Sequence, residues 1–346
     1  MTTRNARRGS PTPPSARPKV SKPVGDLRSQ PVRGRETGAQ RRLGKGYVDL
    51  QVNGYCGIDF NQEDVPVEQF HAACARLRED GVESVLATII TDHVDAMSRR
   101  LKRIVEARKR DPLVKQIIGG IHLEGPFISP VDGYRGAHPR DAVRSADVDA
   151  AKQLTAAAGG ITRIVTLAPE NDPGFKTTRY LAEQGIIVSA GHTDAPLDVL
   201  KGAIDAGLSM FTHLGNGCAI MMHRHDNIIQ RALSLADRLW LCFIADGVHV
   251  PFHALRNYLQ LAGERAIVVT DAMSAAGLGP GRFTVGRWDV VVGEDLAVWA
   301  PDRSHLIGSA MTMHQAEANL SKALGLPTKE IERLTSTNPR RALKLR

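Results

Sequence analysis

The sequence predicts an α/β fold, a (β/α)8 barrel, from two observations. Between Tyr47 and Met273 one unit recurs eight times: a short apolar run, in most cases ending in a polar or ionisable residue, followed by an amphipathic stretch with helical spacing. Four of the runs lead into groups that bind metal or move protons, in HLEGPF, SAGHT, THLGN and VTDAM. Reactive side chains at the carboxyl ends of successive parallel strands are typical of a barrel with one active site at its top face.

The eight expected strands are apolar and β-branched on both faces, as parallel strands covered by helices are. They span residues 47–52, 84–90, 117–124, 161–168, 186–192, 210–213, 239–246 and 266–272. After them, residues 281–310 contain glycine turns and short alternating runs, which predict a β-hairpin inserted over the barrel mouth. The last segments, residues 312–324 and 328–345, have helical spacing.

Composition favours a cytoplasmic enzyme with one large domain. The chain has 346 residues, 42% of them hydrophobic and 24% charged, which suits a barrel of roughly 250 residues with additions. It lacks an uninterrupted apolar span of about 18 residues, so we expect no membrane helix. Its four cysteines lie far apart without CxxC spacing, which argues against a disulfide scaffold.

The net charge of +8 is concentrated in the first residues of the chain. Residues 1–45 carry 12 basic and 2 acidic groups, whereas residues 46–346 carry 33 basic and 35 acidic groups. We therefore expect a disordered basic tail rich in proline and arginine (1–45), then a nearly neutral barrel domain (46–346). A transit peptide or a nucleic-acid arm would fit the tail, but we expect a solvated extension or a misassigned start, and no nucleic-acid partner.

Glu124, His192 and His213 stand at the ends of the third, fifth and sixth expected strands. Two imidazoles and a carboxylate suit a catalytic zinc ion that keeps one position open for water. Each residue alone is as easily explained as a satisfied polar group. Because residues of this kind end three of the expected strands, we interpret the three side chains together as ligands of one divalent metal ion.

Asp271, at the end of the eighth expected strand, lies beside the first strand in a closed barrel. Its carboxylate there would take a proton from water and pass it to a departing nitrogen. Taken alone, Asp271 fits a helix N-cap better. His249, in IADGVHV, is placed to hydrogen-bond a substrate oxygen, although a histidine in a loop is commonly a surface residue.

These motifs together resemble the N-acetylglucosamine-6-phosphate deacetylases of the amidohydrolase superfamily. The resemblance runs in order through DLQVNG, HLEGPFI, GAHP, VTLAPE, SAGHT, THLGN, IADGVHV, VTDAM and LIGSA, over roughly residues 46–346. It implies a TIM barrel of the metal-dependent amidohydrolase type. It also implies hydrolysis of the acetamide of N-acetylglucosamine 6-phosphate, and a homodimer with substrate contacts across the interface.

The resemblance also implies roles for single residues. Glu124, His192 and His213 would hold one divalent ion per subunit, expected to be zinc, with Asp271 as catalytic acid and base and His249 polarising the substrate near its acetamide. The substrate-contacting positions of the family fall on Ala137, His138, Asn216, Gly217, Arg224, Leu306, Ile307 and Gly308. Among these Arg224 would pair with the 6-phosphate, because guanidinium binds phosphate bidentately.

The chain departs from the family pattern in several places. The small β-sandwich of the relatives is expected to be absent or vestigial, because residues 1–45 resemble a tail. Gly217 stands where alanine is usual, and the HRHDN segment around Arg224 is unusual. On the first strand Gln51 stands where many barrel amidohydrolases have a metal-binding HxH pair. An amide is a poor zinc ligand, so we expect one ion rather than two.

Two other functions stay open at this point. The chain would act on another N-acyl or cyclic amide if the Arg224 and His138 regions accept a different substrate. It would be a non-catalytic sugar-phosphate-binding barrel if it had kept the pocket and lost turnover. The presence of all four groups with catalytic chemistry argues against the second possibility.

Overall fold

A computed structural model describes residues 45–285, 288–299 and 306–345. The basic tail expected over residues 1–45 therefore lies outside the described residues, except for its last residue, Lys45.

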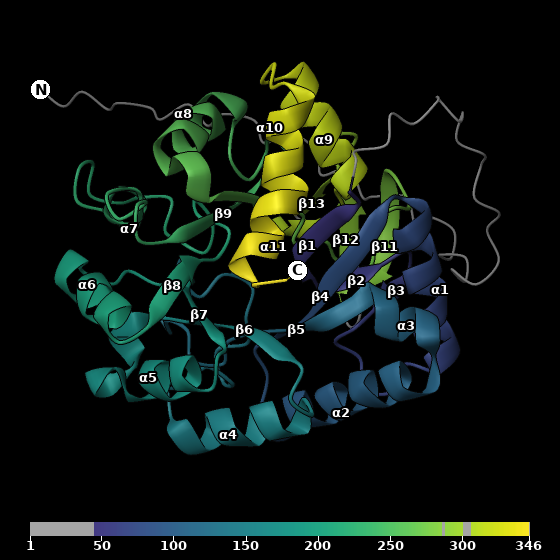
Figure 1. The fold of residues 1–346 in the computed structure, drawn as a ribbon, viewed down its shortest axis with the longest axis horizontal. Coiled ribbons are helices and arrows are strands. Elements are labelled where there is room, and N and C mark those ends of the chain that lie inside the picture. The colour runs from purple at the N-terminus through teal and green to yellow at the C-terminus, as the bar shows by residue number, and fades with distance from the viewer. Residues whose placement is uncertain (1–44, 286–287, 300–305, 346) are drawn as a thin grey trace, which may run out of the picture. The chain divides into compact units, whose positions relative to one another are not determined.

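Eight parallel strands form one sheet in which spatial order follows sequence order (Figure 1). The strands are β1 (Tyr47–Val52), β4 (Val82–Ile90), β5 (Ile118–Glu124), β6 (Thr162–Leu167), β7 (Ile187–Ala190), β8 (Leu208–Phe211), β9 (Trp240–Ile244) and β10 (Ala266–Val269). Each strand pairs in parallel with the next, from β1 to β10. The predicted (β/α)8 barrel is confirmed as a nearly closed eight-stranded parallel barrel.

The barrel is joined between its first and last strands by a short seam. Val52 and Ala272 form an isolated parallel bridge, and the amide of Asn53 donates to the carbonyl of Ala272 at 2.7 Å. Below them, the buried Asp49 carboxylate accepts from the hydroxyl of Thr270 at 2.5 Å and from its amide at 3.2 Å. Side-chain hydrogen bonds thus connect β1 to the end of β10 where the ladder is short.

Helices on the outside of the barrel connect most of the consecutive strands (Figure 1). They are α1 (Val67–Glu79), α2 (Val94–Arg110), α3 (Pro112–Ile117), α4 (Val148–Ala157), α5 (Lys176–Glu183), α6 (Leu197–Asp205), α7 (Ile228–Leu233) and α8 (Phe252–Ala262). In α2, for example, Met97, Leu101 and Ile104 are buried at helical spacing, and three basic residues complement the dipole in its last turn. Apolar spacing therefore explains which face of the helix packs on the strands.

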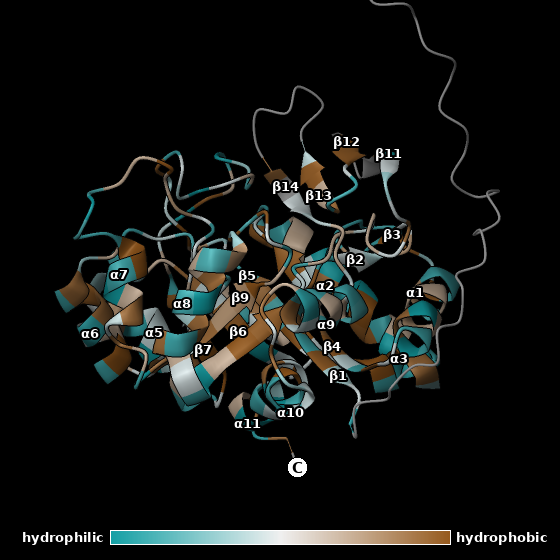
Figure 2. Ribbon diagram, turned by 90° about the horizontal axis from the view of Figure 1, so that it is seen from above, coloured by the Kyte–Doolittle hydropathy of each residue, from teal (hydrophilic) through white to brown (hydrophobic). Residues whose placement is uncertain are grey.

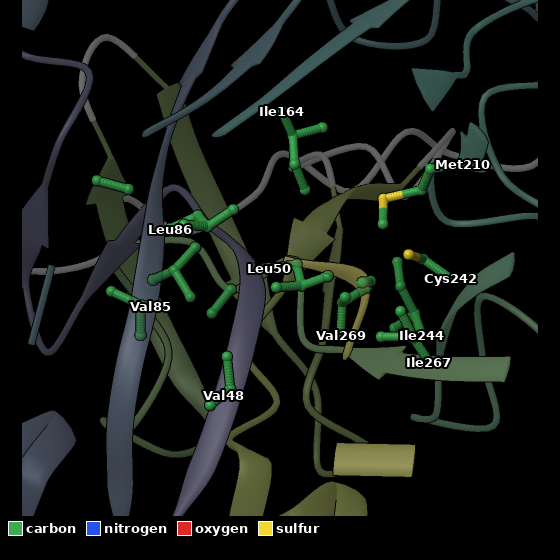
Figure 3. Close-up of a cluster of buried hydrophobic side chains, with 14 of the residues drawn as sticks. Val48, Leu50, Val85, Leu86, Ile164, Met210, Cys242, Ile244, Ile267 and Val269 are labelled. Atoms are coloured by element: carbon green, nitrogen blue, oxygen red, sulfur yellow. The ribbon is translucent and has the colours of Figure 1, made fainter. Parts of the chain in front are cut away.

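The hydrophobic core joins side chains from most of the barrel strands. Figure 3 shows part of this cluster, including Val48 and Leu50 of β1, Ile164 of β6, Met210 of β8 and Val269 of β10. All of these side chains are buried. Because each fully buried aliphatic side chain stabilises the fold by about 1.5–3 kcal/mol, the strands are held mainly by this packing.

A second, polar set of side chains fills part of the barrel interior. The His122 ring donates from Nδ1 to the carbonyl of Leu50, and its Nε2 lies 2.7 Å from the Thr166 hydroxyl. Thr166 and Ser189 each hydrogen-bond the Thr212 hydroxyl at 2.7 Å. Buried polar groups are tolerated when they are paired in this way. This network comes from neighbouring strands and their ends, so it links them below the mouth of the barrel.

The segment after β10 contains four antiparallel strands among its described residues, where the sequence predicts a hairpin. They are β11 (Gly281–Val285), β12 (Trp288–Val292), β13 (Ala297–Trp299) and β14 (Leu306–Ser309). Ser309 forms a bridge with Ala272, which ties this sheet to the barrel. Seen from above, the small sheet and the short strands β2 (Gly54–Tyr55) and β3 (Ile58–Asp59) lie on one side of the barrel (Figure 2).

The chain continues into three helices, α9 (Met313–Lys322), α10 (Thr328–Glu332) and α11 (Asn338–Ala342). A capping box at Thr312 and Gln315 begins α9. In Figure 2, α10 and α11 lie at the opposite end of the barrel from β11–β14. None of the described helices is long and apolar enough to cross a membrane.

Four of the predicted strand ends are placed two or more residues too late. The sequence predicts strands ending at His192, His213, Asp246 and near Asp271, but β7, β8, β9 and β10 each end two residues before those side chains. His192, His213 and Asp271 have positive φ angles of 52°, 31° and 50°. A left-handed residue cannot continue a ladder, so the backbone turns away at these positions.

Asp49 makes stability depend on pH in a direction unusual for a carboxylic acid. Burial raises its pKa to about 7, above the ordinary value near 4 that it regains on unfolding. The folded chain therefore keeps a proton that the unfolded chain releases between those values. This contribution is fully present below pH 4 and is lost as pH rises through about 7.

We expect Asp49→Asn to remove this dependence, because an amide does not ionise. From pH 5 to pH 8 the free energy of unfolding, measured by denaturant titration, should fall less in the variant than in the wild type. We expect the difference between the two changes to be about 1–3 kcal/mol. Equal changes in both proteins would contradict the account of Asp49.

Candidate metal centre and active site

Three buried side chains from separate strands converge at the mouth of the barrel. Glu124 ends β5, and His192 and His213 follow β7 and β8. His213 Nε2 lies 2.8 Å from Glu124 Oε1 and 3.1 Å from His192 Nε2, and His192 Nε2 lies 3.4 Å from the same carboxylate oxygen. One atom from each residue lies within 4.8 Å of the others, which is close enough for all three to share one metal ion.

The surrounding contacts fit these residues to a metal ion. The carbonyl of Tyr134 accepts a hydrogen bond of 2.9 Å from His192 Nδ1, so the lone pair of a neutral ring is left on Nε2, the atom that faces the cluster. Gln51 Nε2 donates to Glu124 Oε1 at 3.0 Å, which fixes the carboxylate. Metal-ligating histidines and carboxylates are typically held by such outer partners.

The electrostatics of the cluster keep the carboxylate ionised. Burial alone would raise the pKa of Glu124, but hydrogen bonds from His192 and His213 hold this pKa well below its ordinary value. Burial would also lower the pKa of His213, yet the contact with Glu124 raises that pKa. An ionised carboxylate among imidazoles is the form that binds a divalent cation.

Asp271 lies beside this cluster, after the end of β10. Asn53 Nδ2 donates to its Oδ1 at 2.7 Å, which leaves the other oxygen for a second partner. Burial, followed by the negative charge of Glu124, raises the pKa of Asp271 to about 6. A carboxyl group with a pKa near neutrality can both accept and return a proton.

His249 is held by a carboxylate in the turn after β9. Its Nδ1 lies 2.5 Å from Asp246 Oδ2, and both side chains are nearly fully buried. Burial would raise the pKa of Asp246, but the hydrogen bond from His249 holds that pKa below its ordinary value. The charge of His249 in turn lowers the pKa of Asp271. The two side chains are therefore close enough to interact electrostatically.

No family model matches the chain, but individual proteins do. An N-acetylglucosamine-6-phosphate deacetylase from Bacillus subtilis is 35% identical over 301 residues, which is 86% of this chain and 74% of the relative. The chain belongs to the N-acetylglucosamine-6-phosphate deacetylase family. The resemblance inferred from its motifs is therefore confirmed.

Two further comparisons extend this relationship. An N-acetylgalactosamine-6-phosphate deacetylase from Escherichia coli O157:H7 is 32% identical, over 86% of this chain and 77% of that relative. The solved structure of a deacetylase variant from Mycobacterium smegmatis, in complex with N-acetyl-D-glucosamine 6-phosphate, matches with a TM-score of 0.78 and 29% identity. That match covers 87% of this chain and 77% of the other. The deacetylase family thus includes relatives named for epimeric sugars.

Three of the substrate-binding positions implied by the deacetylase resemblance lie against the candidate metal ligands Glu124, His192 and His213. His138 is buried, and its Nε2 lies 3.3 Å from His192 Nε2. Burial lowers the pKa of His138 to about 3, so its ring is neutral. Asn216 Nδ2 donates to the carbonyl of His213, and a methyl group added at Gly217 would meet the His192 ring at 2.8 Å. The glycine thus lets this loop lie directly on the imidazole.

The other positions implied by the deacetylase resemblance are two exposed residues and three residues of β14. Ala137 and Arg224 are exposed, and none of the hydrogen bonds or ion pairs among the described residues involves the Arg224 guanidinium. Leu306, Ile307 and Gly308 belong to β14. The carbonyl of Ser309, the last residue of that strand, accepts from the amide of Met273, two residues after Asp271.

Two residues of this candidate site were given no role in the sequence analysis. Asn53 contacts Asp271 across the barrel seam, and the only signal was its place in the DLQVNG motif. Asp246 contacts His249 within one turn, and its signal was the DGVH spacing, because an aspartate commonly caps backbone amides two and three residues later.

Proposed function

We propose that this chain hydrolyses the acetamide of N-acetylglucosamine 6-phosphate to glucosamine 6-phosphate and acetate. The observation that carries the proposal is the convergence of Glu124, His192 and His213 beside Asp271 in a chain of the deacetylase family. A metal-binding cluster next to a carboxyl group of nearly neutral pKa suits hydrolysis of an amide better than binding alone.

Glu124, His192 and His213 would hold one divalent ion per subunit, for which we propose zinc. Two imidazoles and a carboxylate are a donor set of catalytic zinc sites. When bound, the ion supplies an acidified water and a polarised carbonyl. We propose one ion rather than two, because Gln51 offers an amide that already donates its hydrogen to Glu124.

The remaining chemistry falls to side chains of this chain. Asp271 would take a proton from the attacking water through the oxygen that Asn53 leaves free, and then deliver that proton to the departing nitrogen. His249 would hydrogen-bond the acetamide oxygen, where negative charge develops during attack. The partly apolar, buried surroundings of both groups strengthen these interactions.

We assign the sugar phosphate to the loops around His138, Asn216, Gly217, Arg224 and residues Leu306 to Gly308. His138 and Gly217 border the metal cluster, and Arg224 lies farther along the loop that carries Gly217. Guanidinium is suited to the 6-phosphate because its parallel N–H groups match two phosphate oxygens. The N-acetylgalactosamine relative makes the epimeric sugar phosphate the second candidate substrate.

We propose a homodimer formed through the loop after β8. Ile220 and Met221 of this loop are 98% and 88% exposed, and Val131 of the neighbouring loop is 57% exposed. The two loops touch, because a methyl group added at Gly133 would meet Ala219 at 3.0 Å. A second copy would cover this apolar surface and bring its loop close to the first copy's Arg224.

We also propose a cytoplasmic location and a single barrel domain over residues 46–346. Cys74 and Cys242 are buried free thiols, and burial raises the pKa of both, so neither thiol is readily ionised or reactive. The antiparallel strands after β10 would serve as the insertion over the barrel mouth, because Ser309 of β14 contacts residues next to Asp271.

Asp271→Asn separates metal binding from turnover. Purified wild-type protein should contain one tightly bound ion per chain by elemental analysis, and the variant should contain the same amount. The variant should lose about 10²–10⁴-fold in kcat, because an amide cannot accept the proton. Two tightly bound ions per chain would refute the single site, and turnover near the wild-type rate would refute the role of Asp271.

Substrate choice tests the assignment of the phosphate. The kcat/KM for acetate release should be about 10- to 100-fold higher for N-acetylglucosamine 6-phosphate than for N-acetylglucosamine. One hydrogen-bonded pair between a phosphate and a guanidinium contributes a free energy of this size. Arg224→Gln should remove most of this preference without changing turnover of the unphosphorylated sugar. N-acetylgalactosamine 6-phosphate belongs in the same assay. Equal rates with and without phosphate would point to another N-acyl substrate.

Oligomeric state tests the proposed dimer surface. Sedimentation should give the mass of two chains for the wild type and of one chain for Ile220→Asp combined with Met221→Asp, because buried charge opposes association. Leu261→Asp is the matched control, since Leu261 is also an exposed apolar residue, at 61%, but lies on α8. A monomeric wild type, or a double variant that stays dimeric, would show that the surface has another role.

A further inference from the structure

The turn after β9 is built around one buried carboxylate. Asp246 Oδ1 accepts from the amides of Val248 and His249, both at 2.9 Å, and Oδ2 accepts from the His249 ring at 2.5 Å. The Asp246 side chain is 1% exposed and the His249 side chain 7%. A single aspartate therefore fixes both the backbone and the ring of His249.

Two neighbouring contacts keep this turn in place. Gly247 has a φ of 80°, and a methyl group there would meet the Phe252 ring at 2.4 Å, so only glycine fits. Asn319 of α9 donates to the carbonyl of Ala245 at 2.9 Å, which anchors the residue before Asp246. The position of the carboxylate thus follows from packing on two sides.

The contact determines which nitrogen of His249 is available. Because Asp246 is ionised and accepts from Nδ1, that nitrogen carries the hydrogen. No hydrogen bond to Nε2 is found within the described part of the chain. Nε2 is therefore the atom left for a substrate, and it can donate to a carbonyl oxygen only when the ring carries both hydrogens.

We propose that Asp246 is a positioning residue that holds the His249 ring by Nδ1 and so directs Nε2 toward the acetamide oxygen. This inference rests on the proposed deacetylase function. Asp246 itself touches no substrate, and its effect on the rate passes entirely through the His249 ring. A carboxylate that only capped the turn would affect the rate whether or not His249 were present.

A double-mutant cycle distinguishes these two roles. Asp246→Asn keeps an oxygen that accepts from the backbone amides but removes the charge. We expect it to lower kcat about 10- to 100-fold with a smaller change in KM, as for a lost donor to a developing oxyanion. In the His249→Asn background the same substitution should change kcat less than about threefold, because the two residues act as one unit.

Asp172→Asn is a matched control for this cycle. Asp172 is also a buried carboxylate, and it accepts hydrogen bonds from the amides of Thr177 and Thr178 and from the Thr178 hydroxyl. It lies in the loop after β6, away from His249 in the chain. We expect its substitution to leave kcat close to the wild-type value. Losses that add fully in the double variant would overturn the proposal and leave Asp246 as a turn cap.

A second measurement needs no turnover. The buried Nδ1 hydrogen should give a downfield proton resonance in wild-type protein, assigned by its loss in His249→Asn. In Asp246→Asn the resonance should move upfield or disappear through exchange with water. An unchanged resonance, or none in the wild type, would overturn the proposal. If the resonance behaves as expected while no sugar phosphate is hydrolysed, the Asp246 contact stands and the deacetylase function fails.

Discussion

Two imidazole nitrogens and one carboxylate oxygen meet within 3.4 Å in the mouth of the barrel, although they come from three different strands. Nitrogen lone pairs at this separation repel unless a proton or a cation lies between them. The parallel barrel brings Glu124, His192 and His213 to one end, and left-handed residues turn both imidazoles inward. Backbone conformations of this kind cost free energy, and they are found most often at functional sites.

The polar interior of the barrel supports this arrangement from below. His122, two residues before Glu124, hydrogen-bonds Leu50 and Thr166, and Thr166 is linked through Thr212, the neighbour of His213. Burial lowers the pKa of His122 to about 4, so this ring is neutral and accepts from the Thr166 hydroxyl. These neutral, hydrogen-bonded side chains hold the strands together without adding charge beneath Glu124, His192 and His213.

The sequence predicted the barrel and the metal cluster because both follow from periodicity. Apolar runs repeat, and Glu124, His192 and His213 occupy equivalent places in their units. The strand ends at His192, His213 and Asp271 were placed late because an apolar pattern carries no information on the sign of φ. Asn53 was missed because its contact with Asp271 joins residues more than two hundred positions apart. Asp246 was taken as a strand end, although its contact with His249 is local.

Anomalous diffraction from crystals of the metal-loaded protein tests the central claim most directly. Data collected on both sides of the absorption edge of the bound metal should give one strong peak per chain, within bonding distance of Glu124, His192 and His213. A peak at another place, a second equal peak beside Gln51, or three side chains too far apart to share the ion would contradict the account.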